Sequence, residues 1–285
     1  MRSKGADRYL KILAIAAAVC GCAAVVIAVN SGKNKELKKE FRYAALGDSI
    51  PNGYLCGECL EEDMKGYPRL LKEELGRTGD MSVNLSQYTK NGITVNGLYE
   101  EYLSDEKVRK DLQKADFITV TVGANDLLVQ FRKLYRELFK DEENIADIET
   151  VFSVIQRETD EDPMLLKEAA ELIDGWELDA FERDWERMME CLRQNCKEDA
   201  CIIVTTLYNP VGEKETPKLL SRVIGRLIGD MNRVIVSCSK KYNCQTADLS
   251  DIGVERHLQP DGLHPDCQGQ KIIAGRIAEE YGERQ

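Results

Sequence analysis

The chain has 285 residues, long enough for one domain of about 200–250 residues and a short additional segment. Hydrophobic residues make up 43% and charged residues 31% of the sequence, which is typical of a globular protein and excludes a disordered one. The formal net charge is −11, so the surface repels phosphate backbones, and we expect no nucleic acid among the partners.

The N-terminal segment contains a long uncharged apolar run. Residues 1–11 form a basic flank, and residues 12–29 follow with the sequence ILAIAAAVCGCAAVVIAV. In a helix this run spans about 27 Å, close to the thickness of the bilayer core. No A-x-A cleavage site follows, so the sequence favours a transmembrane signal anchor over a cleaved signal peptide. We therefore expect a single-pass cell-membrane protein whose following domain lies outside the cytoplasm.

After a polar, lysine-rich linker at residues 30–41, residues 42–285 alternate short apolar runs with longer amphipathic stretches. The short runs predict strands at Tyr43–Leu46, Ser82–Leu85, Phe117–Val122, Cys201–Leu207 and Gln245–Leu249. The amphipathic stretches predict helices at Tyr67–Leu75, Gly97–Leu103, Glu177–Cys196, Leu219–Lys241 and Gln268–Tyr281. This alternation predicts an α/β domain with a parallel sheet covered on both faces.

The interval from Leu127 to Ala200 is too long for a single crossover between two strands. Its apolar spacing predicts further helices, separated by acidic turns, at Leu134–Lys140, Ile148–Ile155 and Met164–Leu172. We interpret the interval as a helical insertion over one rim of the sheet. It acts either as a lid or substrate wall or as a solvated cap with no part in the chemistry.

The chain contains ten cysteines, of which Cys56 and Cys59 form a CxxC pair. No second CxxC or HxxxH motif supplies the four ligands of a zinc site, so we expect no metal. Ordinary thiols, one or two disulfides, and a redox role are the alternatives for the cysteines. If the domain is exported, this pair is a candidate disulfide.

The segment GDSI, residues 47–50, directly follows the first predicted strand. A serine just past the carboxyl end of a strand lies where open α/β sheets bind ligands. The glycine permits a sharp turn at that point. Ser49 is therefore a candidate nucleophile. The alternative is an ordinary turn, because the sequence Gly-Asp-Ser at residues 47–49 also occurs in turns.

The segment DGLHP, residues 261–265, precedes the last predicted helix and contains one of the two histidines of the chain. A serine hydroxyl needs a base near neutral pH, and imidazole, with an ordinary pKa of about 6.5, suits that task. Asp261 could hold Nδ1 of His264 and leave Nε2 for the serine. A helix-capping turn is the alternative. His257 lacks such a carboxylate and is predicted to be a loop residue.

Two more turns follow predicted strands. In the segment GAND, residues 123–126, the side-chain amide of Asn125 is a neutral donor suited to an oxyanion hole. In the segment NGIT, residues 91–94, Gly92 could present its backbone N–H to the same oxyanion. A plain turn is the alternative for both, and Gly97 competes with Gly92.

Taken together, these segments resemble the sequence blocks of the GDSL, or SGNH, hydrolase family. GDSI resembles block one, with Ile50 in place of leucine, and NGIT, GAND and DGLHP resemble blocks two, three and five. The segment IVTTLYNP, residues 203–210, is also similar to many members. The resemblance implies a flavodoxin-like three-layer sandwich with about five parallel strands. It also implies ester hydrolysis through an acyl-enzyme without metal or organic cofactor.

The same resemblance implies a role for each residue. Ser49 is the nucleophile, His264 its base, and Asp261 the carboxylate that orients the histidine. The backbone N–H groups of Ser49 and Gly92 and the side-chain amide of Asn125 hold the oxyanion. Asp48, next to the nucleophile in block one, is interpreted as a structural residue that fixes the turn around Ser49.

Two alternatives to a serine esterase stay open: a non-catalytic surface binding domain of the same fold, and an acyltransferase that uses the same site. An α/β-hydrolase is excluded by the lack of a G-x-S-x-G motif. Candidate substrates are O-acetylated glycans, lysophospholipids and simple acyl esters. The predicted anchor adds the membrane as a partner and favours cell-wall glycan or lipid.

Overall fold

A computed structural model describes residues 40–57, 59, 64–78, 81–139, 154, 157–158, 161–211 and 218–283. They belong to the second of two compact units, which begins at Glu40. The predicted transmembrane segment, residues 12–29, lies outside the described residues. In the part of the chain that is described, no helix has both the length and the apolar character needed to cross a bilayer.

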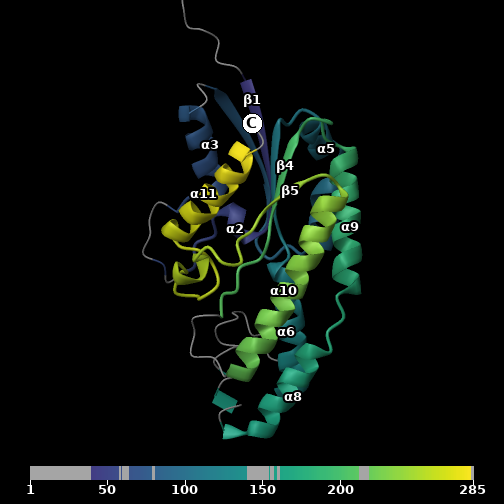
Figure 1. Ribbon diagram of the computed structural model, residues 1–285, viewed down its shortest axis with the longest axis vertical. Helices are drawn as coiled ribbons and strands as arrows, with labels where there is room; N and C mark the ends of the chain where they lie inside the picture. Colours follow the sequence, from purple (N-terminus) through teal and green to yellow (C-terminus); the bar gives the residue numbers. More distant parts are fainter. Residues whose placement is uncertain are drawn as a thin grey trace, which may run out of the picture. The chain divides into compact units, whose positions relative to one another are not determined.

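A parallel sheet lies at the centre of the second unit, with strand order β2-β1-β3-β4-β5 (Figure 1). Its strands are β1 (Glu40–Gly47), β2 (Ser82–Thr89), β3 (Phe117–Thr121), β4 (Cys201–Thr205) and β5 (Gln245–Ala247). This is the order of flavodoxin-like sheets, in which the strand order reverses between β1 and β3. All five predicted strands are present, so the predicted α/β fold with a five-stranded parallel sheet is confirmed.

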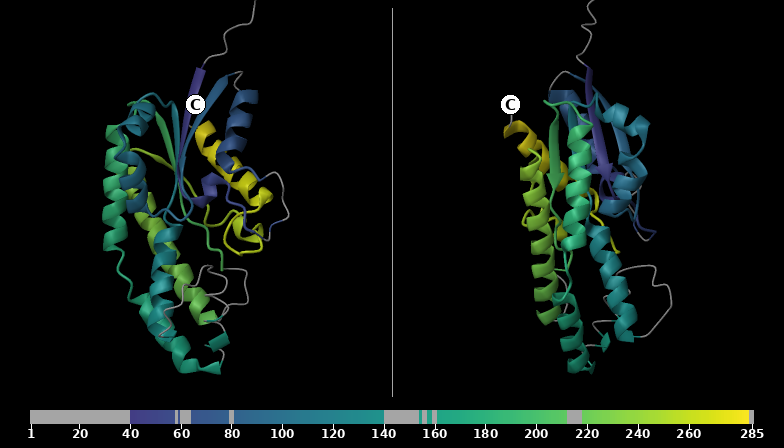
Figure 2. Two further views of the ribbon diagram at one scale, coloured as in Figure 1. Left: turned by 180° about the vertical axis from the view of Figure 1, so that it is seen from behind. Right: turned by 90° about the vertical axis from the view of Figure 1, so that its right-hand side faces the viewer.

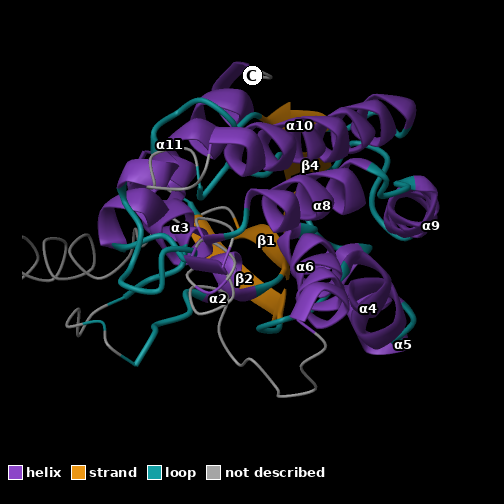
Figure 3. Ribbon diagram, turned by 90° about the horizontal axis from the view of Figure 1, so that it is seen from below, coloured by secondary structure: helices purple, strands orange, loops and turns teal. Residues whose placement is uncertain are grey.

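Helices cover both faces of the sheet (Figures 2 and 3). One face carries α3 (Tyr67–Thr78) and α11 (Cys267–Glu283). The other carries α4 (Val95–Leu98), the π-helix η1 (Tyr99–Leu103), α5 (Glu106–Leu112), α6 (Ala124–Phe139), α9 (Asp179–Gln194) and α10 (Lys218–Lys241). Successive side chains of a strand point to opposite faces. In β1, accordingly, Tyr43 and Ala45 join one buried apolar cluster, and Ala44 and Leu46 join the other.

The interval between β3 and β4 contains α6, α8 (Pro163–Asp174) and α9, as the predicted insertion requires. In this interval α9 packs against α10 and α4 beside the sheet, whereas α8 packs against α6 and α10. Figure 1 shows α8 and much of α6 and α10 extending past the carboxyl ends of the strands. Nearly all of the predicted helix Ile148–Ile155 lies outside the described residues.

Helices α5 and α6 differ from the sequence-based expectation. The seven-residue α5 was not predicted, and it begins where the carboxylate of Asp105 accepts hydrogen bonds from the N–H groups of Lys107 (2.7 Å) and Val108 (3.1 Å). Helix α6 begins at Ala124, ten residues before the predicted start. Asn125 therefore lies in the first turn of a helix. Asparagine and aspartate in that turn hide the start because both also favour non-helical turns.

The turn after β1 depends on Gly47. Its φ is +147°, and a Cβ atom at this position would lie 2.0 Å from the carbonyl oxygen of Thr121 in β3. The N–H of Asp48 donates to the same carbonyl at 3.1 Å. The backbones of β1 and β3 thus approach closely where α2 (Ser49–Asn52) begins.

We predict that Gly47→Ala lowers the free energy of unfolding by more than about 2 kcal/mol, because the methyl group meets backbone in a conformation that alanine avoids. Gly229→Ala in α10 is the control. There an added Cβ meets nothing within 4 Å, and stability should rise by about 0.5–1 kcal/mol. Urea unfolding of both variants measures the difference. Equal stabilities would contradict this role of Gly47.

Candidate active site

Ser49 begins the short helix α2, immediately after β1. The carboxylate of Asp48 caps that helix by accepting a hydrogen bond from the N–H of Ile50 at 2.9 Å. Burial raises the pKa of Asp48 to about 7, although the bond from Ile50 and the nearby His264 act in the opposite direction. Asp48 thus holds the turn around Ser49 from a buried position and does not face the solvent.

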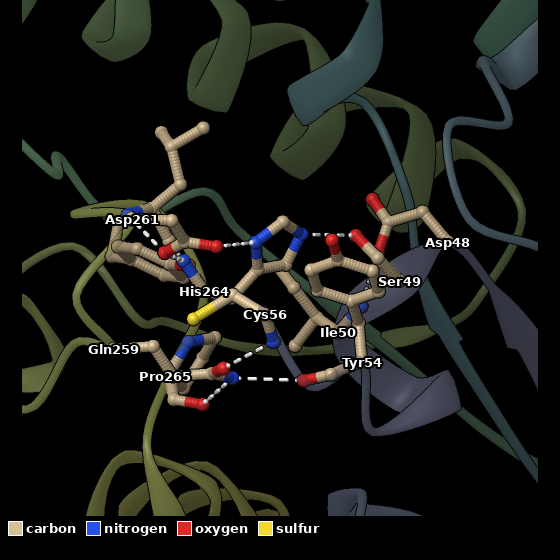
Figure 4. A network of polar contacts seen from close by, with 11 residues as sticks. Asp48, Ser49, Ile50, Tyr54, Cys56, Gln259, Asp261, His264 and Pro265 are labelled. Atoms are coloured by element: carbon tan, nitrogen blue, oxygen red, sulfur yellow. Dashed lines mark hydrogen bonds and ion pairs between the residues drawn. The ribbon is translucent and has the colours of Figure 1, made fainter. Parts of the chain in front are cut away.

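Ser49, His264 and Asp261 form one continuous chain of hydrogen bonds (Figure 4). The Nε2 atom of His264 lies 2.8 Å from Oγ of Ser49, and its Nδ1 atom lies 2.6 Å from Oδ2 of Asp261. The other oxygen of Asp261 accepts hydrogen bonds from the N–H groups of Leu263 and His264, both at 3.0 Å. The structure therefore brings together the three residues that the sequence singled out.

The charge on Asp261 determines which nitrogen of His264 can accept a proton. Burial acts to raise the pKa of Asp261, but hydrogen bonds from the side chain of His264 and from two backbone N–H groups lower it below its ordinary value. Asp261 is therefore ionised near neutral pH and accepts a hydrogen bond from the N–H at Nδ1, where the imidazole proton stays. Nε2 is then free to accept the proton of the Ser49 hydroxyl, which is the arrangement needed for general-base activation.

Two buried glutamines tie the Ser49 segment to the His264 segment, and the sequence analysis did not find them. Gln259 accepts from the N–H of Cys56 at 2.9 Å and donates to the carbonyls of Tyr54 (2.8 Å) and Pro265 (2.9 Å). These contacts are drawn in Figure 4. Each partner in the serine segment is more than 200 residues away in the chain, so no local pattern could have revealed it.

Gln270, in α11, makes the second connection. It accepts from the N–H of Tyr67 at 2.8 Å and donates to the carbonyl of Ile50 at 2.9 Å. The imidazole of His264 also packs on the ring of Tyr54, with 4.4 Å between the ring centroids. The base is therefore held by packing as well as by hydrogen bonds.

Asn125 and Gly92 border the same pocket as Ser49. One N–H of the Asn125 amide donates to the carbonyl of Ile93 at 3.0 Å, which fixes the side chain and leaves its second N–H for a ligand. Gly92 has a φ of +79°, and an added Cβ would meet nothing within 4 Å, so its backbone is open to the pocket. Gly97 is instead inside α4, where its N–H donates to Thr94. The geometry thus favours Gly92 over Gly97.

Asp126 joins α6 to the segment that contains Gly92. Its carboxylate accepts a hydrogen bond from the N–H of Val95 at 3.1 Å. Burial raises the pKa of Asp126 to about 7, with hydrogen bonds from backbone N–H groups acting in the opposite direction. Asp126 therefore holds the two predicted oxyanion segments in one arrangement.

The pocket has a volume of about 830 Å³, within the range of sites that take small-molecule ligands. At one end lie the serine, histidine, glycine and asparagine described above. The rest of the wall is mainly apolar and comes from α6, α10 and the segments after β4 and around Leu263; it includes Leu127, Leu128, Leu207, Pro210 and Ile228. The insertion therefore forms part of the pocket wall through α6.

The remaining candidate residues lie apart from this arrangement. His257 follows the 3₁₀ helix η2 (Val254–Arg256) and does not line the pocket. Cys56 lines the pocket wall, but Cys56 and Cys59 are both free thiols, so the candidate disulfide between them is not present. Among the described residues, no group of three or more histidine, cysteine, aspartate or glutamate side chains is placed to hold a metal ion.

Comparison with known proteins supplies independent information. The Bacillus subtilis (strain 168) protein described as "Uncharacterized protein YpmR" is 27% identical over 255 residues, covering 87% of this chain and 86% of that protein. Among solved structures, the lipase Lip_vut3 from a goat rumen metagenome has a TM-score of 0.59 and 21% identity, covering 84% of this chain and 97% of its own. The acetylxylan esterase Axe2 from Geobacillus stearothermophilus has a TM-score of 0.55 and 17% identity, covering 87% and 96%.

At these identities the two structures show a shared fold. The family model described as "GDSL-like Lipase/Acylhydrolase family" matches residues 45–272, well over half of the chain. This match confirms the resemblance found in the sequence segments. Since it extends from β1 into α11, the chain belongs to the GDSL-like lipase/acylhydrolase family.

Proposed function

We propose that this protein is a serine esterase that hydrolyses carboxylic esters through an acyl-enzyme on Ser49. The observation that carries the proposal is the hydrogen-bond chain from Asp261 through His264 to Ser49, which reaches the surface of an open pocket. Family membership supports the same reaction class.

In the proposed reaction, Oγ of Ser49 attacks the ester carbonyl while Nε2 of His264 takes the hydroxyl proton. Asp261 stabilises the resulting imidazolium. The carbonyl oxygen becomes an oxyanion and accepts hydrogen bonds from Ser49 N–H, Gly92 N–H and the free N–H of Asn125. His264 then gives its proton to the leaving alcohol. A water molecule next attacks the acyl carbonyl while His264 takes its proton, and His264 returns that proton to Oγ of Ser49 as the carboxylic acid leaves.

We also propose a class of ester substrate from the size and lining of the pocket. The volume of the pocket far exceeds that of an acetyl group, and the wall beyond the serine is apolar. This favours an ester whose acyl group or alcohol has a substantial apolar portion, as in a lysophospholipid or a longer acyl ester, over a bare O-acetyl group.

We predict that Ser49→Ala and His264→Asn each lower kcat by at least about 10³-fold, because neither variant can form the activated nucleophile. His257→Asn is the matched control, since His257 lies outside the pocket, and its activity should stay within about twofold. Hydrolysis of a p-nitrophenyl ester measures all three variants. Labelling by a fluorophosphonate probe, lost in Ser49→Ala, reports on the nucleophile independently of the substrate. Normal turnover by Ser49→Ala would exclude this mechanism.

We predict that Asn125→Ala lowers kcat by about 10²–10³-fold, the usual loss for one oxyanion donor. KM should change little, because this hydrogen bond strengthens in the transition state. Asn84→Ala is the control, because Asn84 is exposed on β2 and does not line the pocket, and its kcat should stay within about twofold of the wild-type value. A defect of Asn125→Ala confined to KM would assign it to substrate binding instead.

We also propose that the domain acts outside the cytoplasm, tethered through residues 12–29, on the strength of the apolar run and its basic flank. The full-length chain should then sediment with membranes, and a chain starting at Glu40 should not. Protease added to intact cells should degrade the full-length domain. Protection from that protease would contradict the orientation, and a soluble full-length chain would contradict the tether.

A further inference from the structure

The pocket follows one face of α6 for two helical turns beyond the oxyanion donor. Ala124, Asn125, Leu128 and Arg132 line it from this helix, at the spacing of a single helical face. From Asn125 to Arg132 the helix rises about 10 Å. Figure 1 shows that this part of α6 leads away from the sheet.

The wall along these two turns changes from apolar to cationic. Leu128 lies between Asn125 and Arg132 on α6 and makes this part of the wall apolar, and Leu207 and Ile228 are further apolar residues of the same pocket. Arg132 lies at the outer end, where it is exposed to solvent and still lines the pocket. A ligand that extends from Ser49 along α6 therefore passes apolar side chains first and then meets a guanidinium group.

Arg132 differs from several other cations of the domain in its electrostatic surroundings. Lys90, Lys241 and Arg276 each form an ion pair with a glutamate. Within the described part of the chain, no carboxylate lies within ion-pair distance of Arg132. The formal net charge of the chain is −11, so a cation at the mouth of the pocket opposes a general repulsion of anions.

We propose that Arg132 determines specificity by binding an anionic group that the ester carries about 10 Å from its scissile carbonyl. A guanidinium presents paired N–H donors that match a carboxylate or a phosphate. The anionic group belongs either to the acyl portion or to the alcohol portion of the ester, since the chemistry that binds it is the same. This proposal rests on the proposed esterase function and extends it to a substrate class.

Two pairs of esters test it and distinguish the two sources of the charge. The acyl-side pair is p-nitrophenyl octanoate and the mono-p-nitrophenyl ester of octanedioic acid. The alcohol-side pair is hexyl acetate and 6-acetoxyhexyl phosphate. In each pair the two esters share the same apolar chain and differ in whether it ends in an anionic group.

The measured quantity is the ratio of kcat/KM for the anionic ester to kcat/KM for the neutral ester of the same pair. For at least one pair, Arg132→Gln should lower this ratio about tenfold, as expected for one lost charge-assisted hydrogen bond. The change should come mainly from a higher KM for the anionic ester. Lys133→Gln is the matched control. It removes the same charge from the adjacent exposed residue, which does not line the pocket, and should leave the ratio within about twofold. The pair that responds identifies the side of the ester that carries the charge.

Arg132→Glu should lower the ratio further than Arg132→Gln, and Arg132→Lys should restore part of it. Raising NaCl from about 0.05 M to about 0.5 M should weaken the preference in the wild type and not in Arg132→Gln. Equal ratios for wild type, Arg132→Gln and Lys133→Gln on both pairs would overturn the proposal.

A binding measurement separates this proposal from the esterase proposal. In the Ser49→Ala background the intact esters bind without turnover, and calorimetry gives their Kd. The anionic member of one pair should bind about tenfold more weakly when Arg132→Gln is added, whether or not the wild type hydrolyses it. Failure of hydrolysis with this binding preference intact would refute the esterase and retain the role of Arg132. Equal binding of all four esters to both variants would refute the role of Arg132.

Discussion

The contact between Nε2 of His264 and Oγ of Ser49 joins residues 215 positions apart, and the proposed chemistry depends on keeping it at 2.8 Å. A proton transfer of this kind tolerates only small displacements. The two segments that supply these residues are held together by the buried amides of Gln259 and Gln270, each of which both donates and accepts hydrogen bonds across the junction. Loss of either amide would leave buried backbone groups without partners, so their contribution exceeds that of ordinary surface contacts.

The two carboxylates nearest Ser49 have opposite protonation tendencies, and this difference separates their roles. Burial raises the pKa of Asp48, whereas hydrogen bonds lower the pKa of Asp261 despite its partial burial. Asp261 is thus the stable negative charge beside His264, while Asp48 retains substantial neutral character near neutral pH. Such divergence between neighbouring acids is how one site assigns different tasks to similar groups. Here it limits the negative charge close to the position where an oxyanion would form.

The sequence predicted β3 and β4 most directly, because each is a short run of β-branched and apolar residues, as the burial of these strands on both faces requires. It also singled out Ser49, Asp261 and His264, because Ser49 directly follows a predicted strand and the other two residues directly precede the last predicted helix. It could not supply Gln259 or Gln270, because their partners are distant in the chain. The early start of α6 was missed for a local reason: its first turn contains residue types that also form turns.

The start of α6 at Ala124 determines how the two ends of the pocket are connected. Because α6 begins at Ala124, one rigid helix carries Asn125 at its first turn and the outer pocket wall two turns later. Phe131 and Leu134 of the same helix are buried in the core. A group bound beside Arg132 would therefore be held at a nearly fixed distance from Asn125, the proposed oxyanion donor. Recognition at the outer end of the pocket would then position the ester carbonyl for attack, because both contacts belong to the same helix.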